Sequence, residues 1–299
     1  TPTADDMVDW NIVQIVEGQP DNILWQARYG MHPLAGSRDG RAIAWIHQGF
    51  DATASIDELW TLALGGEPAR IAVDYAGGMV WADWMPDGTA LLVAAIDGTS
   101  TRLGRIAATG GVIVDLLAGQ TLAETNTQQP CASVSGDGRH MACVIESGVE
   151  PKQVWAGELG GALRMIAARN EHLADVRPGA TRTIRWQAPD GLEIEGVLIT
   201  PHNYQEGQRV PLIVHIHGGP TWQWLDRHMA SWHDWGQWLA ANGYAVLLPN
   251  PRGSSGRGNE FRRMNQRNWG HCDLDDVLSG IDYLITGGIA DPDRLGIGG

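Results

Sequence analysis

Glycine-containing turns recur at a regular interval along the first 180 residues, and this period is the strongest constraint on the fold. Asp-Gly pairs occur at 39–40, 87–88 and 137–138. Gly-Gly pairs repeat with the same spacing of 45 to 50 residues, at 65–66, 110–111 and 160–161. Because both pairs permit the positive φ that tight hairpin turns need, they are strong hairpin signals between apolar runs.

Apolar runs flank these turns in a constant order. RAIAWIHQ, ALLVAAID and HMACVIES follow the Asp-Gly pairs, while ELWTLAL and QVWAGEL precede Gly-Gly pairs. A repeat of about 40–50 residues with four short strands is typical of a β-propeller blade. We therefore predict a partial β-propeller over residues 1–180. A β-sandwich with coincidental turn spacing is the alternative, and the regular period favours the propeller.

The pattern changes near residue 180. Residues 183–201 predict a β-hairpin that turns at Asp190-Gly191. The continuous apolar runs at 210–217 and 244–250 predict strands buried on both faces, and RLGIGG at 294–299 opens a third.

Two helices are predicted between these strands, at 231–243 and 273–288. In the second helix one apolar stripe is expected to face the core; it comprises Leu274, Val277, Leu278, Ile281 and Leu284. Strands that alternate with helices indicate a parallel sheet with right-handed crossovers. We expect residues 181–299 to form an incomplete α/β domain.

The charge and cysteine content exclude several classes of function. A formal charge of −14 and a pI of about 5.0 disfavour binding to nucleic acid or to an anionic membrane surface. No run approaches the roughly 18 apolar residues of a membrane span, and the first residues lack the features of a signal peptide. Three scattered cysteines form neither a disulfide framework nor a zinc motif, so we expect a cytoplasmic protein.

The segment His217-Gly218-Gly219-Pro220 follows a predicted buried strand directly. Acyl transfer builds negative charge on a carbonyl oxygen, and backbone N–H groups fixed in a tight loop stabilise that charge. Paired glycines let the main chain turn and approach a substrate without a Cβ clash. We predict an oxyanion loop here, bordered by Trp222. A plain Gly-Gly-Pro turn is the alternative.

Two other chemistries of this segment are less favoured. His215 and His217 share one strand face and could bind a metal, but no third ligand lies at a fixed spacing. In α/β-hydrolases the catalytic histidine follows the nucleophile and the acid along the chain, so His217 is a poor candidate for the base. We expect no metal and no cofactor.

The loop Asn250-Pro251-Arg252-Gly253-Ser254-Ser255-Gly256 follows the next predicted strand and should line the same crevice. Arg252 could pair with a substrate carboxylate, or it could hold the loop by pairing within the protein. No nucleophile elbow surrounds Ser254 or Ser255, and no Lys-Ser/Thr follows to make a phosphate-binding loop.

Four motifs in succession resemble landmarks of the prolyl oligopeptidase family of serine peptidases, which includes dipeptidyl peptidases and acylaminoacyl peptidases. They are HGGP, NPRGSSGRG, NWGHCDLDDVLSGIDYL and ADPDRLGIGG. The resemblance implies the N-terminal half of an α/β-hydrolase fold after the propeller. It also implies that Gly299 opens a G-x-S-x-G elbow whose Ser lies two residues later, with the Asp and His of the triad further on.

The function implied by this resemblance is acyl-enzyme hydrolysis of short peptides, for instance as an aminopeptidase. Gly219, Gly218 and His217 would serve the oxyanion, while Arg252 and Trp222 would bind the substrate. The implied partners are a short peptide and the C-terminal remainder of the catalytic domain, without which the chain should be inactive. An esterase or amidase on the same scaffold, or a propeller binding module with an inactive hydrolase remnant, are the alternatives.

Overall fold

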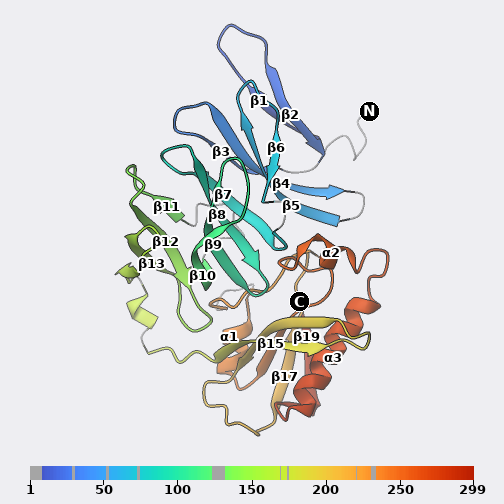
Figure 1. Cartoon of the computed structure of the whole chain (residues 1–299). Helices are drawn as coiled ribbons and strands as arrows, with labels where there is room; N and C mark the ends of the chain where they lie inside the picture. Colours follow the sequence, from blue (N-terminus) through green and yellow to red (C-terminus); the bar gives the residue numbers. More distant parts are fainter. Residues whose placement is uncertain are drawn as a thin grey trace.

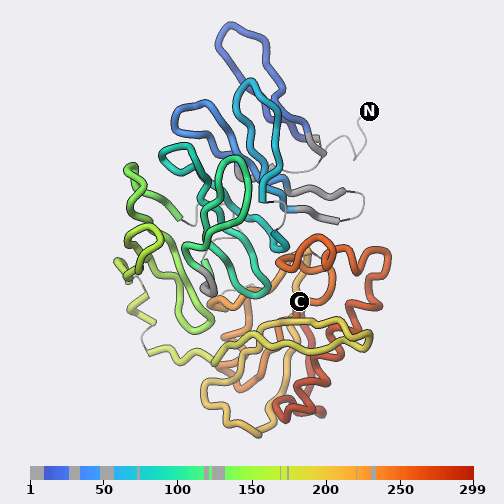
Figure 2. Tube along the Cα trace, in the orientation of Figure 1, coloured from blue at the N-terminus to red at the C-terminus, as the bar shows by residue number. Residues whose placement is uncertain are grey.

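The computed structural model describes residues 9–28, 31–51, 54–72, 75–122, 132–168, 170–173, 175–219, 221–229 and 234–299. Figure 1 shows antiparallel sheets in the first part of the chain and a mixed sheet with helices in the last part. Figure 2 follows the chain as it leaves the antiparallel sheets and enters the mixed sheet near residue 180.

The first part is built from short antiparallel strands. One pair comprises β1 (Asp9–Gln14) and β2 (Asn22–Arg28). A four-stranded unit follows, with β3 (Met31–Gly36), β4 (Ala42–Asp51), β5 (Ala54–Ala63) and β6 (Ala69–Ile71). The next unit contains β7 (Gly78–Trp84), β8 (Ala90–Asp97), β9 (Ser100–Ala107) and β10 (Val114–Leu122). The last contains β11 (Ala132–Val134), β12 (His140–Glu146), β13 (Gln153–Glu158) and β14 (Leu163–Ala167).

The predicted turns are confirmed. Gly40, Gly88 and Gly138 have φ of 70°, 70° and 72°, and each amide donates to the carbonyl three residues earlier. At the same turns the Asp39 and Asp137 carboxylates accept the amides of Arg41 and Arg139. The regular period therefore reflects one repeated hairpin geometry.

The units do not form a clear propeller. β10 pairs with β9 along most of its length and then with β12 at Thr121 and Leu122, so two units merge into one eight-stranded sheet. The four-stranded antiparallel repeat is confirmed, and its closure as a propeller stays a prediction.

The last part of the chain is a five-stranded mixed sheet. Its strands are β15 (Ala180–Gln187), β16 (Glu193–Thr200), β17 (Val210–His215), β18 (Ala245–Asn250) and β19 (Ala290–Gly298). Their order is β15-β16-β18-β17-β19; β16 is antiparallel to both neighbours, while β17 is parallel to β18 and β19. Its helices are α1 (Gly236–Ala241), α2 (Gly258–Arg263) and α3 (Cys272–Thr286), and a 3₁₀ helix (Glu171–Leu173) precedes the sheet.

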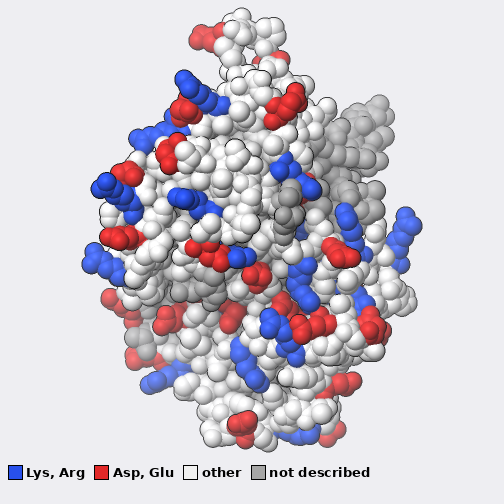
Figure 3. All heavy atoms as spheres, in the orientation of Figure 1, with Lys and Arg blue, Asp and Glu red and all other residues white. Residues whose placement is uncertain are grey.

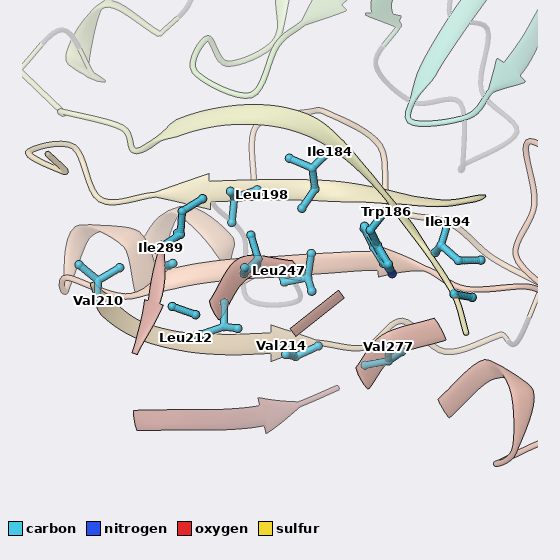
Figure 4. Close-up of a cluster of buried hydrophobic side chains, with 14 of the residues drawn as sticks. Ile184, Trp186, Ile194, Leu198, Val210, Leu212, Val214, Leu247, Val277 and Ile289 are labelled. Carbon is cyan, nitrogen blue, oxygen red and sulfur yellow. The ribbon is translucent and has the colours of Figure 1, made fainter. Parts of the chain in front are cut away.

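Figure 4 shows the main core of this sheet, which includes the buried side chains of Ile184, Leu198, Leu212 and Leu247. α3 packs closely on it because Gly280 has no side chain; a Cβ there would lie 2.8 Å from the Trp186 ring. The core is mainly aliphatic, with the rings of Trp186 and Phe261 among its buried side chains, as continuous apolar strands predict.

Two expectations need correction, and a third stays open. Of the predicted stripe of α3, Val277 and Leu284 are buried and Ile281 packs against the core, but Leu274 and Leu278 are each 47% exposed, because Asp276 and Gly280 complete the buried face. In this chain β19 is the edge strand of the sheet, and Ile297 is 72% exposed; burial of this strand on both faces stays a prediction. The helix predicted over 231–243 is described only from Gly236 to Ala241; residues 231–233 lie outside the described residues.

No helix within the described part of the chain is long and apolar enough to cross a membrane. On the face drawn in Figure 3 acidic and basic side chains are interspersed, with no continuous basic stripe of the kind that follows a nucleic-acid backbone.

Candidate functional site

A cavity of about 330 Å³ brings together four of the residues that the sequence singled out. His217, Gly218, Trp222 and Gly299 all contribute to its wall. The remaining lining residues are His215, Ile216, Trp224 and Trp235. Residues separated by up to 84 positions in the sequence (215 to 299) therefore meet at one place.

The sheet register explains this meeting. β17 and β19 are parallel neighbours in which His215 is paired with Gly298, and the amide of Ile216 donates to the carbonyl of Gly298 at 2.8 Å. Both strands therefore leave the sheet at the same edge, where ligands of open α/β sheets bind. In Figure 1 the end of β19, marked C, lies on the side of the sheet that faces the antiparallel units.

Gly218 and Gly219 differ in whether their backbone conformation and surroundings would admit a side chain. Gly219 has φ of +127°, and a Cβ there would lie 2.8 Å from the amide nitrogen of Trp222. At Gly218 a Cβ would meet nothing within 4 Å. Only Gly219 is therefore restricted to glycine by both its conformation and its surroundings. Gly219 adjoins the cavity through Gly218 and is not itself part of the lining.

His217 is held by hydrogen bonds on both ring nitrogens. Its Nδ1 lies 2.9 Å from the carbonyl oxygen of Gly218, and its Nε2 lies 3.0 Å from the Ser254 hydroxyl. Burial lowers the pKa of His217 below its ordinary value. Ser254 is 1% exposed, and its hydroxyl oxygen also lies 2.6 Å from the Pro251 carbonyl oxygen. That Ser254 is not a nucleophile stays a prediction.

Aromatic rings form the rest of the wall. Trp222 and Trp224 meet edge to face at 5.0 Å between centroids, and His215 stacks on Trp235 at 4.6 Å. The Trp224 indole donates to the His215 carbonyl at 3.0 Å. Among the described residues no group of three or more His, Cys, Asp or Glu side chains could hold a metal ion. Indole faces and one polar loop suit an apolar side chain of a ligand.

Arg252 lies outside this cavity lining. Its guanidinium donates to Asp276 through Nε and Nη2 and to Asp190 through Nη1 and Nη2, at 2.6–3.1 Å. Asp276 is fully buried and also accepts the Arg252 amide at 2.8 Å. The hydrogen bond from Arg252 lowers the pKa of Asp190 to about 2. These contacts favour the interpretation in which Arg252 holds the loop.

Sequence reasoning missed the partners that hold the site residues. Asp276 lies on the buried face of α3, and an acid at a core-facing position is a signal that it pairs with a buried base. Ser254 and Trp235 gave no such signal, because their contacts with His217 and His215 depend on how the loops pack.

Comparison with known proteins agrees with this architecture. Residues 231–299 match the model of the prolyl oligopeptidase family. This segment of the chain is therefore similar to the prolyl oligopeptidase family. The chain is 32% identical over 176 residues to the uncharacterized peptidase YuxL of Bacillus subtilis. The matched region covers 56% of this chain and 25% of the relative. The chain is 36% identical over 92 residues to dipeptidyl-peptidase 5 of Aspergillus oryzae, covering 31% of this chain and 12% of the relative.

A solved structure shares the fold over nearly the whole chain. The acylaminoacyl peptidase of Pyrococcus horikoshii superposes with a TM-score of 0.76 at 21% identity, covering 96% of this chain and 43% of that one. The chain therefore spans a quarter or less of the length of these two curated relatives.

Proposed function

We propose that this chain supplies the oxyanion loop and part of the substrate surface of a serine peptidase that hydrolyses short peptides through an acyl-enzyme. The proposal rests on one observation: the loop at His217 and Gly218 and the end of β19 at Gly299 line the same cavity. Peptidases among the matched relatives support the choice of a peptide as substrate.

The proposed chemistry needs a serine two residues beyond Gly299, where the family resemblance implies one. Its hydroxyl oxygen would attack the substrate carbonyl carbon, and a histidine would accept its proton and then pass that proton to the leaving amine. Water would then release the acyl group. The loop at Gly218 and Gly219 would stabilise the oxyanion with backbone N–H groups, a contribution of about 2.7–4 kcal/mol per donor.

The remaining parts of the proposal follow from this assignment. A complementary C-terminal segment would cover β19, and the antiparallel units would limit access to short peptides as a propeller gate. Arg252 would act on substrate only through the loop that it holds. A cytoplasmic location and aminopeptidase action stay predictions.

The test compares substrates on the full-length protein encoded by the gene. Aminoacyl and blocked-peptide anilides and simple esters are assayed with and without a fluorophosphonate. Peptide anilide turnover that the fluorophosphonate abolishes supports the peptidase. Turnover of esters alone would indicate the esterase alternative, and no turnover of any substrate would indicate an inactive remnant.

A further inference from the structure

The contact between the antiparallel units and the mixed sheet includes a buried ion pair. Asp57 on β5 pairs with Arg262 on α2, although 205 positions separate them in the sequence. Their side chains are 8% and 5% exposed. Figure 1 shows α2 directly next to β5. A buried pair of this kind fixes the relative position of the two elements, because separating it leaves a charge without a partner.

Arg262 extends this contact towards the proposed active site. The same Nη2 that binds Asp57 also donates to the Ser255 hydroxyl at 2.7 Å. Ser255 is 6% exposed, and its amide donates to the Trp222 carbonyl at 3.2 Å. Arg262 thus fixes a residue that contacts the chain directly after the oxyanion loop.

The neighbouring residue completes the connection. Ser254 lies 3.0 Å from His217 Nε2, and His217 lies 2.9 Å from the Gly218 carbonyl through Nδ1. The loop from Ser254 to Ser255 therefore contacts the chain at His217, where the oxyanion loop begins, and at Trp222, just after that loop. Any shift of this loop moves the backbone that is proposed to receive the oxyanion.

We propose that Asp57 is a positioning residue for the oxyanion loop and acts through Arg262 and Ser255. This inference rests on the proposed function. It assigns the antiparallel part of the chain a role in transition-state stabilisation in addition to restricting access. Small errors in donor position lower the rate steeply, since a displacement of about 1 Å can cost on the order of 100-fold.

The adjacent residue on β5 provides a matched control. Glu58 pairs with Arg70 within the first four-stranded unit, and that arginine side chain is 46% exposed. Asp57→Asn and Glu58→Gln each remove one negative charge from neighbouring positions. Only the first change affects the contact with α2.

The experiment measures kcat and KM of full-length variants on a peptide anilide. We expect Asp57→Asn and Ser255→Ala each to lower kcat about 10-fold with KM changed less than about 3-fold, the pattern of a lost transition-state interaction. The double variant should lose no more than either single variant, because both changes interrupt one connection. Glu58→Gln should match the wild type. The proposal would be overturned if the losses of kcat multiplied in the double variant, or if Asp57→Asn and Ser255→Ala each kept full activity.

A second measurement does not depend on activity. The Ser255 amide is protected by the Trp222 carbonyl, and its hydrogen exchange reports the stability of that contact. We expect exchange about 10-fold faster in Asp57→Asn and unchanged in Glu58→Gln. Unchanged exchange of the Ser255 amide in Asp57→Asn would refute the connection from Asp57 to the loop, whether or not the protein is active. Inactivity of the wild-type protein would instead refute the proposed function.

Discussion

The two carboxylates that bind Arg252 should differ sharply in their contribution to stability. Asp276 is fully buried and accepts three side-chain hydrogen bonds and one backbone hydrogen bond from Arg252. Removing one partner of such a buried pair costs about 3–5 kcal/mol, because the remaining charge loses its buried partner. The Asp190 side chain is 55% exposed, and a contact of that kind contributes about 0–1 kcal/mol.

The assay compares Asp276→Asn with Asp190→Asn by thermal unfolding of the full-length protein, followed by tryptophan fluorescence. At roughly 2–4 °C per kcal/mol, a loss of about 3 kcal/mol lowers Tm by roughly 6–12 °C. The Asp190→Asn variant should change Tm by no more than about 4 °C. Equal and small shifts for both variants would refute the assignment of Asp276 as the buried partner that holds the loop.

Three further outcomes are expected. The Asp190 carboxyl should titrate below its ordinary pKa of 3.8 by NMR, because it accepts hydrogen bonds from Arg252. The stability from this contact is therefore present above about pH 4 and is lost as the pH falls below it, and a midpoint at or above 3.8 would contradict this. The His217 ring should titrate below pH 6.5, because burial disfavours its charged form. Its contribution to the free energy of unfolding is therefore complete above pH 6.5 and decreases as the pH falls. A titration midpoint at or above pH 6.5 would contradict this burial. In the full-length enzyme Gly219→Ala should lower kcat by about 100- to 1,000-fold, because a Cβ at Gly219 would clash with the Trp222 amide. Gly218→Ala should leave Tm nearly unchanged, because a Cβ at Gly218 meets nothing within 4 Å. Full activity of Gly219→Ala would argue against the oxyanion loop.

The sequence predicted those parts of the fold that depend on local chemistry. Asp-Gly turns require positive φ, and Gly40, Gly88 and Gly138 all adopt it. The continuous apolar runs formed β17 and β18 close to the predicted bounds, since a strand buried on both faces leaves a simple pattern.

The sequence failed where the result depends on packing between distant segments. Leu274 and Leu278 of the predicted α3 stripe are exposed, and Asp276 faces the core to meet Arg252, a pairing that helical periodicity does not reveal. The Asp57–Arg262 pair joins positions 205 residues apart, and neither residue belongs to a motif.

The central claim is that β19 leads to a nucleophile beside the His217–Gly219 loop. The most direct measurement is to label the full-length protein with a fluorophosphonate and to map the modified residue by peptide mass spectrometry. We predict a single modified serine two residues after Gly299. Modification at Ser254 or at another position, or no modification of a protein that hydrolyses peptides, would contradict the claim.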